Sequence, residues 1–267
     1  MVELSDLPVE LLLHIHLQCL SSTLPLVSRS FYHVLSTTSP YHKAQYLLLR
    51  HPSHKTLSHA IKYPICTLAV LRTLERLHHE RHPTKRLKLA QLPKRLFSSS
   101  PGSSIPKREQ DDNLHRIELV RYLLETYKSD PNSHQGYPLT RAVFKLDRDL
   151  IALLLEHGAD PGLKQGWAVV TAILKAKDFV KRDRGLGLQF VKSLIERDYP
   201  VPALDDSVRV DLVEPTTKRK KKKLKLEDRC KPSPEMLETA VKTKQWDIVD
   251  YLTLKGATPN LNVLKML

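Results

Sequence analysis

The thirteen histidines of this 267-residue chain are the residues that first suggest metal binding or proton transfer. His78 and His82 stand four residues apart and would share one face of a helix, as two metal ligands could. However, His79 and Arg81 crowd them and Pro83 ends the element. Cations near a helix C-terminus are favourable in themselves. We therefore predict that the chain has no metal site.

Motifs that carry catalysis are missing from the sequence. It contains no G-x-x-x-x-G-K-S/T phosphate loop, no G-x-G-x-x-G turn and no G-x-S-x-G elbow. Cys19, Cys66 and Cys230 are far apart and form no C-x-x-C pair, which argues against a disulfide framework and a zinc site. The acidic pairs 111–112 and 205–206 fall among prolines and serines, where a role in turns is typical. We predict a protein that is not an enzyme and needs no cofactor.

Composition predicts an intracellular protein, nuclear and cytoplasmic. Hydrophobic residues make up 41% of the chain, which is enough for a packed core. No apolar run approaches the ~18 residues that cross a bilayer. Glu3 and Asp6 occupy the positions where a secretory signal would carry Lys or Arg. We expect neither export nor a membrane partner.

The elements that would position these side chains are predicted to be helices in a recurring unit. Pro138 can open a helix that runs to Lys145 with apolar residues at i, i+3 and i+4. A second helix fits Asp149 to Glu156, and Gly158 suits a left-handed cap after it. A unit of this kind cannot bury its apolar face alone and must stack on copies of itself.

Copies of the unit are indicated on both sides. Three segments share a Leu-rich helix ending followed by a turn, at 123–132, 153–161 and 251–260, and 194–200 is a weaker fourth. The helix, turn, helix and glycine stop resemble the ankyrin repeat, which implies a stack that binds other proteins. An ordinary helical bundle is the alternative. Five alanines stand in a comparable first-helix context: Ala60, Ala90, Ala142, Ala172 and Ala240.

The N-terminal segment carries a second resemblance. Leu-Pro-Val-Glu-Leu-Leu at 7–12 opens a helix, and Leu-Val-Ser-Arg-Ser-Phe follows at 26–31. Together they resemble an F-box, whose short helices bind the Skp adaptor of Skp–cullin–F-box ubiquitin ligases, although the spacing here is a few residues shorter than usual. Alternatively, these helices only cap the repeat stack. His14 and His16 are expected to be exposed or to face a partner. The resemblance implies that the adaptor-facing or F-box-packing residues are Leu7, Pro8, Leu11, Ile15, Leu24, Val27 and Phe31.

The whole chain resembles fungal F-box and ankyrin-repeat proteins. We predict an all-α fold, an ankyrin-type helical-repeat solenoid with an F-box-like motif at 1–40. Degenerate repeats would fill 41–267, with low-complexity insertions at about 97–112 and 203–232. The resemblance implies a substrate-recognition subunit that binds the Skp adaptor, the cullin ligase core and an unknown target protein. The alternative is a non-catalytic ankyrin-repeat scaffold or nuclear adaptor without ligase association.

Two further sets of candidate residues come from position and charge. Tyr137, Trp167 and Glu235 border first-helix turns and are predicted target contacts, although Trp167 and Trp246 also occupy positions consistent with packing. A dense basic run favours, in order, a nuclear-import signal read by an importin, a solvated loop, or a nucleic-acid contact. Nucleic acid is the least favoured because no aromatic residues interleave with the cations. The run comprises Lys218, Arg219, Lys220, Lys221, Lys222, Lys223 and Lys225.

Overall fold

The computed structural model describes residues 7–51, 55–98, 106–180, 184–196 and 230–266. Within these ranges the chain is mostly helical and has no β-strand, apart from one isolated bridge between Gln91 and Asp130, which confirms the all-α prediction there. The chain divides into two compact units, Met1–Asp130 (unit 1) and Pro131–Leu267 (unit 2). None of the described helices is long and apolar enough to span a membrane.

Unit 1 begins with short helices whose ends are set by local hydrogen bonds. Ser28 caps α3 by accepting a hydrogen bond from the backbone nitrogen of Phe31 at 3.2 Å, and Ser39 caps α4 in the same way. α2 packs on α3, α1 and α6 pack on α4, and α7 packs on α6. The helices are α1 (Val9–Cys19), α2 (Leu24–Val27), α3 (Arg29–Thr37), α4 (Pro40–Arg50), α5 (Thr56–Ala60), α6 (Leu68–Arg81), the 3-10 turn η2 (Lys94–Leu96) and α7 (Pro106–Tyr127).

Polar groups join α1 to α4. The ring nitrogens Nδ1 of His16 and Nε2 of His42 lie 3.1 Å apart, and His16 stacks on Tyr46 with ring centroids 4.3 Å apart. Arg50 donates to the carbonyl of Leu20, which ends α1 in the left-handed conformation. His16 is therefore buried, and the expectation that it is exposed was wrong. It failed because the helix turns His16 to the same side as Leu12, four residues earlier.

The segment around Ala90 is not a helix, so the prediction of a first helix there was wrong. Residues 85–90 have no regular structure, and Ala90 is exposed. The carbonyl of Ala90 accepts a hydrogen bond from the nitrogen of Asp130 at 3.0 Å, and Leu89 accepts one from Ser129. Pairing with the chain after α7 therefore replaces helical hydrogen bonds. α7 itself begins at Pro106, inside the expected 97–112 insertion.

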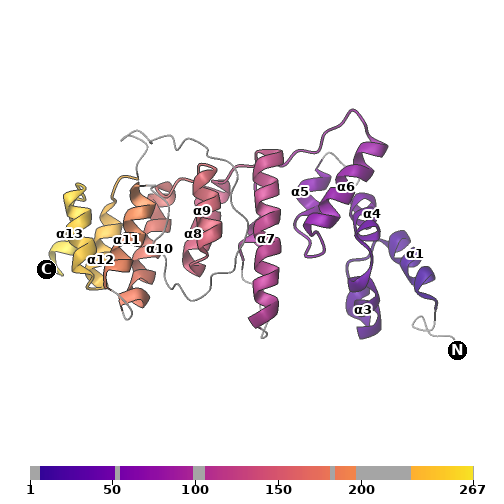
Figure 1. Ribbon diagram of the computed structural model, residues 1–267, viewed down its shortest axis with the longest axis horizontal. Coiled ribbons are helices and arrows are strands. Elements are labelled where there is room, and N and C mark those ends of the chain that lie inside the picture. The colour runs from indigo at the N-terminus through magenta and orange to yellow at the C-terminus, as the bar shows by residue number, and fades with distance from the viewer. Residues whose placement is uncertain (1–6, 52–54, 99–105, 181–183, 197–229, 267) are drawn as a thin grey trace, which may run out of the picture. The chain divides into compact units, whose positions relative to one another are not determined.

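Unit 2 is a row of helix pairs. α8, α10 and α12 are in contact in that order, and α9, α11 and α13 pack against them as second helices (Figure 1). Ala142, Ala172 and Ala240 are buried at matching positions of α8, α10 and α12, where a small side chain allows close approach. The helices are α8 (Ser133–Lys145), α9 (Arg148–Glu156), α10 (Leu163–Val180), α11 (Arg184–Glu196), α12 (Pro234–Lys242), α13 (Trp246–Leu254) and α14 (Leu261–Leu264).

The helix ends repeat the same geometry along unit 2. Gly158 and Gly256 both have φ of +89°, as the left-handed cap requires. The residues after them, Ala159 and Ala257, donate to carbonyls five residues back at 2.9 and 3.0 Å. The predicted glycine stop of 153–161 is confirmed, and 251–260 has the same backbone hydrogen bonds around its glycine.

The turns that open α8 and α10 are also alike. His134, Gln135 and Gly136 all have positive φ, and so do Lys164, Gln165 and Gly166, 30 residues later. An aromatic residue follows each turn, Tyr137 in α8 and Trp167 in α10. Most residues avoid this conformation, so two equal runs of three indicate one repeated local structure.

Candidate protein-interaction surfaces

Exposed apolar side chains are frequent on the first three helices of unit 1. Leu26 is 77% and Val27 69% exposed on α2, and Tyr32 is 60% exposed on α3. On α1, Val9 and Leu11 are about half exposed. Five exposed apolar side chains on three successive short helices are the candidate partner contacts of unit 1. We call these five residues the N-terminal apolar residues.

The seven residues predicted for the adaptor divide by burial. Pro8, Leu11 and Val27 are exposed and could contact a partner, whereas Phe31 is only 5% exposed and packs in the unit's own core. Leu7, Ile15 and Leu24 are partly exposed. Sequence reasoning missed Val9, Leu26 and Tyr32, although the amphipathic pattern of α3, with Phe31 and Leu35 inward, would have placed Tyr32 outward.

The histidine pair behind α1 is structural. Burial, together with His42 and Arg50, lowers the pKa of His16 to about 4, and burial also lowers the pKa of His42. Both rings are therefore neutral near pH 7, and one can donate to the other. The hydrogen bond between the two rings holds α1 on α4, and both rings are buried.

A cluster of titratable groups lies between α6 and α7 in unit 1. Tyr122 and Tyr127 donate to the two carboxylate oxygens of Glu75 at 2.7 and 2.5 Å. Burial and this carboxylate raise the pKa of both phenols, and burial raises the pKa of the nearby Cys66 thiol to about 12. A thiol that stays protonated is a poor nucleophile. Within the described ranges, no group of three or more His, Cys, Asp or Glu could hold a metal ion.

The outer side of α8 and α10 in unit 2 combines exposed apolar rings with cations. Phe144 is 48%, Trp167 46% and Trp246 52% exposed, so each ring is partly packed against the protein and partly open to solvent. Arg141 and Lys175 lie over the Phe144 ring, 5.0 and 4.8 Å from its centroid. Lys164 lies 5.1 Å from the Trp167 centroid. We call this surface the aromatic–basic face; it comprises Tyr137, Arg141, Phe144, Lys164, Trp167, Leu174 and Lys175.

The three predicted target contacts occupy matching positions on successive first helices. Tyr137 and Trp167 lie at the start of the regular parts of α8 and α10, and Glu235 lies in the first turn of α12. Ser233, the cap of α12, donates to the carbonyl of Gln165 at 3.0 Å. With its amide nitrogen toward α12, Gln165 also donates to Glu235 at 2.6 Å. The structure thus brings the turn before Trp167 next to Glu235.

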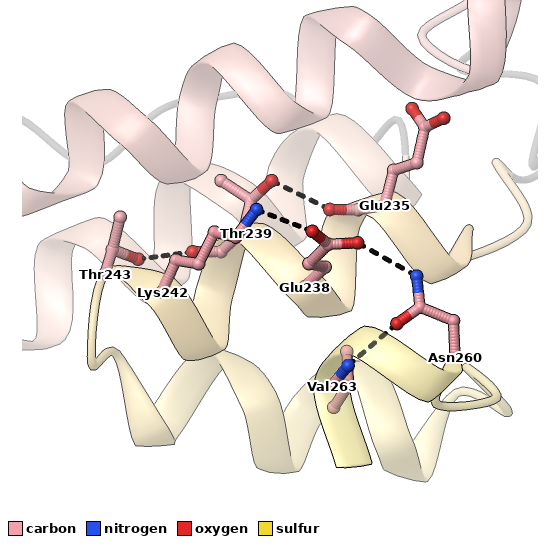
Figure 2. A network of polar contacts seen from close by, with 7 residues as sticks. All are labelled: Glu235, Glu238, Thr239, Lys242, Thr243, Asn260 and Val263. Carbon is pink, nitrogen blue, oxygen red and sulfur yellow. Dashed lines mark hydrogen bonds and ion pairs between the residues drawn. The ribbon is translucent and has the colours of Figure 1, made fainter. Parts of the chain in front are cut away.

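α12 is anchored to the end of unit 2 by a polar network. Glu238 accepts from Lys242 at 2.5 Å and from Asn260 at 2.9 Å, and Asn260 caps α14 by accepting from Val263 (Figure 2). Glu238 therefore has a structural role at the position that corresponds to Val170 in α10. The first-helix surface changes from basic and aromatic on α10 to acidic on α12.

The basic run from Lys218 to Lys225 lies outside the described residues. Comparison with known proteins does not place the chain in a family: no family model matches it, and no curated protein and no solved structure matches it.

Proposed function

We propose that this chain is the substrate-recognition subunit of a Skp–cullin–F-box ubiquitin ligase. Helices α1–α3 would bind the Skp adaptor, and the first helices and turns of unit 2 would bind the target protein. The N-terminal apolar residues are the observation that carries the proposal, since Leu11 and Val27 are exposed where the F-box resemblance requires a partner. The chain would do no chemistry itself, and other subunits would transfer ubiquitin.

The local structure of α3 supports the F-box-like interpretation. Ser28 of the Val-Ser-Arg-Ser-Phe segment is the helix cap, and Phe31 is the buried anchor. Val27, one residue before the cap, remains exposed. The segment therefore divides into a buried anchor and an exposed apolar side chain, which supports a docking role for it.

Unit 2 supports the target-binding part of the proposal. The matching glycine caps, buried alanines and left-handed turns support a stack of ankyrin-type repeats. Such stacks present first-helix and turn side chains from a rigid scaffold, and this suits protein recognition.

Co-purification with the Skp adaptor tests the proposal. We expect the full chain to retain the adaptor, and the Leu11→Asp and Val27→Asp variants to lose it by at least about 10-fold, because a buried carboxylate in an apolar interface is costly. Leu254→Asp is the matched control, since Leu254 is an 87% exposed leucine of unit 2. A parent chain that does not retain the adaptor would overturn the proposal.

The second candidate is a scaffold or nuclear adaptor without ligase association. It is favoured by the contacts that make α1 part of unit 1, namely the His16–His42 pair and the Arg50 hydrogen bond to Leu20. In that case α1–α3 would cap the helices behind them. The same co-purification separates the candidates, because only the ligase subunit retains the adaptor through Leu11 and Val27.

A further inference from the structure

The helices of the aromatic–basic face are strongly basic. α8 and α10 together contain five Lys and Arg residues and a single acidic residue, Asp178. Positive charge concentrated on neighbouring helices attracts an acidic ligand and speeds its association. The cations are Arg141, Lys145, Lys164, Lys175 and Lys177.

An apolar stripe runs along α10 between these cations. Trp167, Val170 and Leu174 stand at i, i+3 and i+7, which places them on one side of the helix. Leu174 is 51% exposed, and Phe144 stands at the matching position of α8, 30 residues earlier. Trp167 and Leu174 are about half exposed and Val170 is partly buried, so this side of α10 offers apolar side chains that a ligand could cover.

On this face each exposed aromatic ring has a cation beside it, so one ligand can contact both. Lys164 lies against Trp167, while Arg141 and Lys175 lie against Phe144 from their own and the neighbouring helix. A ligand carboxylate that reaches such a cation is brought beside an exposed ring. A bulky apolar ligand side chain on that ring removes water, which strengthens the cation–ring attraction.

The acidic surface of α12 sets the boundary of the face. Glu238 is held by Lys242 and Asn260, and these hydrogen bonds lower its pKa, so it is ionised (Figure 2). Glu235 is exposed in the first turn of α12. Because Lys242 neutralises Glu238, Glu235 is the carboxylate at this edge that repels an acidic ligand and favours its binding on α8 and α10.

We infer that the aromatic–basic face binds an acidic peptide segment of the target protein, one that carries a bulky apolar side chain among its Asp and Glu residues. The inference rests on the proposed function, in which unit 2 holds the target, and it adds the chemical class of what is held. Charge selects the segment, and the rings of Phe144 and Trp167 select its apolar side chain.

Selection from a library of random displayed peptides on the full chain tests this inference. We expect the selected peptides to be enriched in Asp and Glu together with Leu, Phe or Trp. Their affinity should fall about 10-fold in Trp167→Ala and in Lys164→Glu, because each removes one of the two attractions. Leu254→Ala and Lys62→Glu are the matched controls, since both change exposed residues that are not among those of the face. Glu235→Gln should leave the affinity unchanged or raise it by a few-fold.

Three results would overturn the inference: no selectable peptide, peptides without acidic enrichment, or peptides that bind Trp167→Ala and Lys164→Glu as tightly as the parent. Lys164 is exposed, so its substitution keeps the test valid if Trp167→Ala disturbs the fold. Adaptor co-purification is measured on the same variants and should be unchanged. Acidic peptides on a chain that retains no adaptor would refute only the ligase proposal, and the reverse result would refute only this inference.

Discussion

Replacement of Gly166 by alanine tests how α12 packs on the turn of α10. Gly166 has φ of +78°, and a Cβ built there would lie 1.9 Å from the methyl carbon of Met236. The methyl carbon is the end of a flexible side chain, but Met236 is fully buried, so it has to shift within a packed core to make room. Gly158 and Gly256 share the positive φ but have open space around the position of a Cβ. Alanine substitutions at these two glycines therefore measure the cost of the positive φ alone.

The expected changes in the free energy of unfolding follow from the positive φ at each glycine and from the Met236 contact at Gly166. Alanine in the left-handed region destabilises the folded chain by about 1–2 kcal/mol. Replacing glycine also lowers the entropy of the unfolded chain, which stabilises the fold by about 0.4–1 kcal/mol. Gly158→Ala and Gly256→Ala should therefore lower the free energy of unfolding by about 1 kcal/mol. Gly166→Ala adds an overpacked methyl group, which brings its total to about 2–4 kcal/mol.

Urea unfolding followed by circular dichroism measures the three variants under equal conditions. A double-mutant cycle with Met236→Ala isolates the contact, because shortening Met236 removes the clash. The double variant should be more stable than the sum of the single effects by about 1–2 kcal/mol. Gly166→Ala could lower the free energy of unfolding no more than Gly158→Ala does, and the cycle could show no coupling. In that case Met236 does not pack on the α10 turn, and the stacking of α12 on α10 described above is wrong.

Three other predictions concern separate features. The pKa of His16, about 4, lies below its unfolded value near 6.5, so the free energy of unfolding should be highest above pH 6.5 and fall by about 1–3 kcal/mol as the pH drops toward 4. Unfolding measured against pH should show a smaller loss for His16→Phe, in which the buried His42 still contributes, and an unchanged loss would contradict this. Glu75→Gln should lower the free energy of unfolding by about 1–3 kcal/mol because it weakens two tyrosine hydrogen bonds, while the exposed Glu80→Gln on the same helix should change it by less than about 0.5 kcal/mol; equal losses would contradict this. A fluorescent fusion should leave the nucleus when residues 218–225 are deleted, and a fusion that stays nuclear would remove the import-signal hypothesis.

Much of unit 2 could be predicted because its signals are local. The apolar spacing predicted a helix at Asp149–Glu156, one residue short of α9, and the left-handed cap of Gly158 follows from glycine's lack of a Cβ. The run of three left-handed residues at 134–136 could not be predicted, since only its glycine favours positive φ. The matching Gln-Gly-aromatic sequence 30 residues later was a signal that sequence reasoning could have used.

Unit 1 was harder to predict because long-range contacts override its local pattern. The Leu-rich stretch at 87–92 has a helical spacing, yet Ala90 pairs with Asp130, 40 residues away in the sequence. The burial of His16 depends on His42 and Tyr46 of α4, which give it a hydrogen bond and a stacking partner, and the local sequence does not show these contacts. The exposure of Val27 and Leu26 likewise depends on where α2 packs, which no periodicity in a four-residue helix can indicate.

Titration of the purified full chain with the purified Skp adaptor, followed by size-exclusion chromatography, tests the central proposal most directly. We expect a one-to-one complex that the Val27→Asp variant fails to form and the Leu254→Asp variant still forms. Separate elution of the two parent proteins, or a complex that tolerates Val27→Asp, would contradict it.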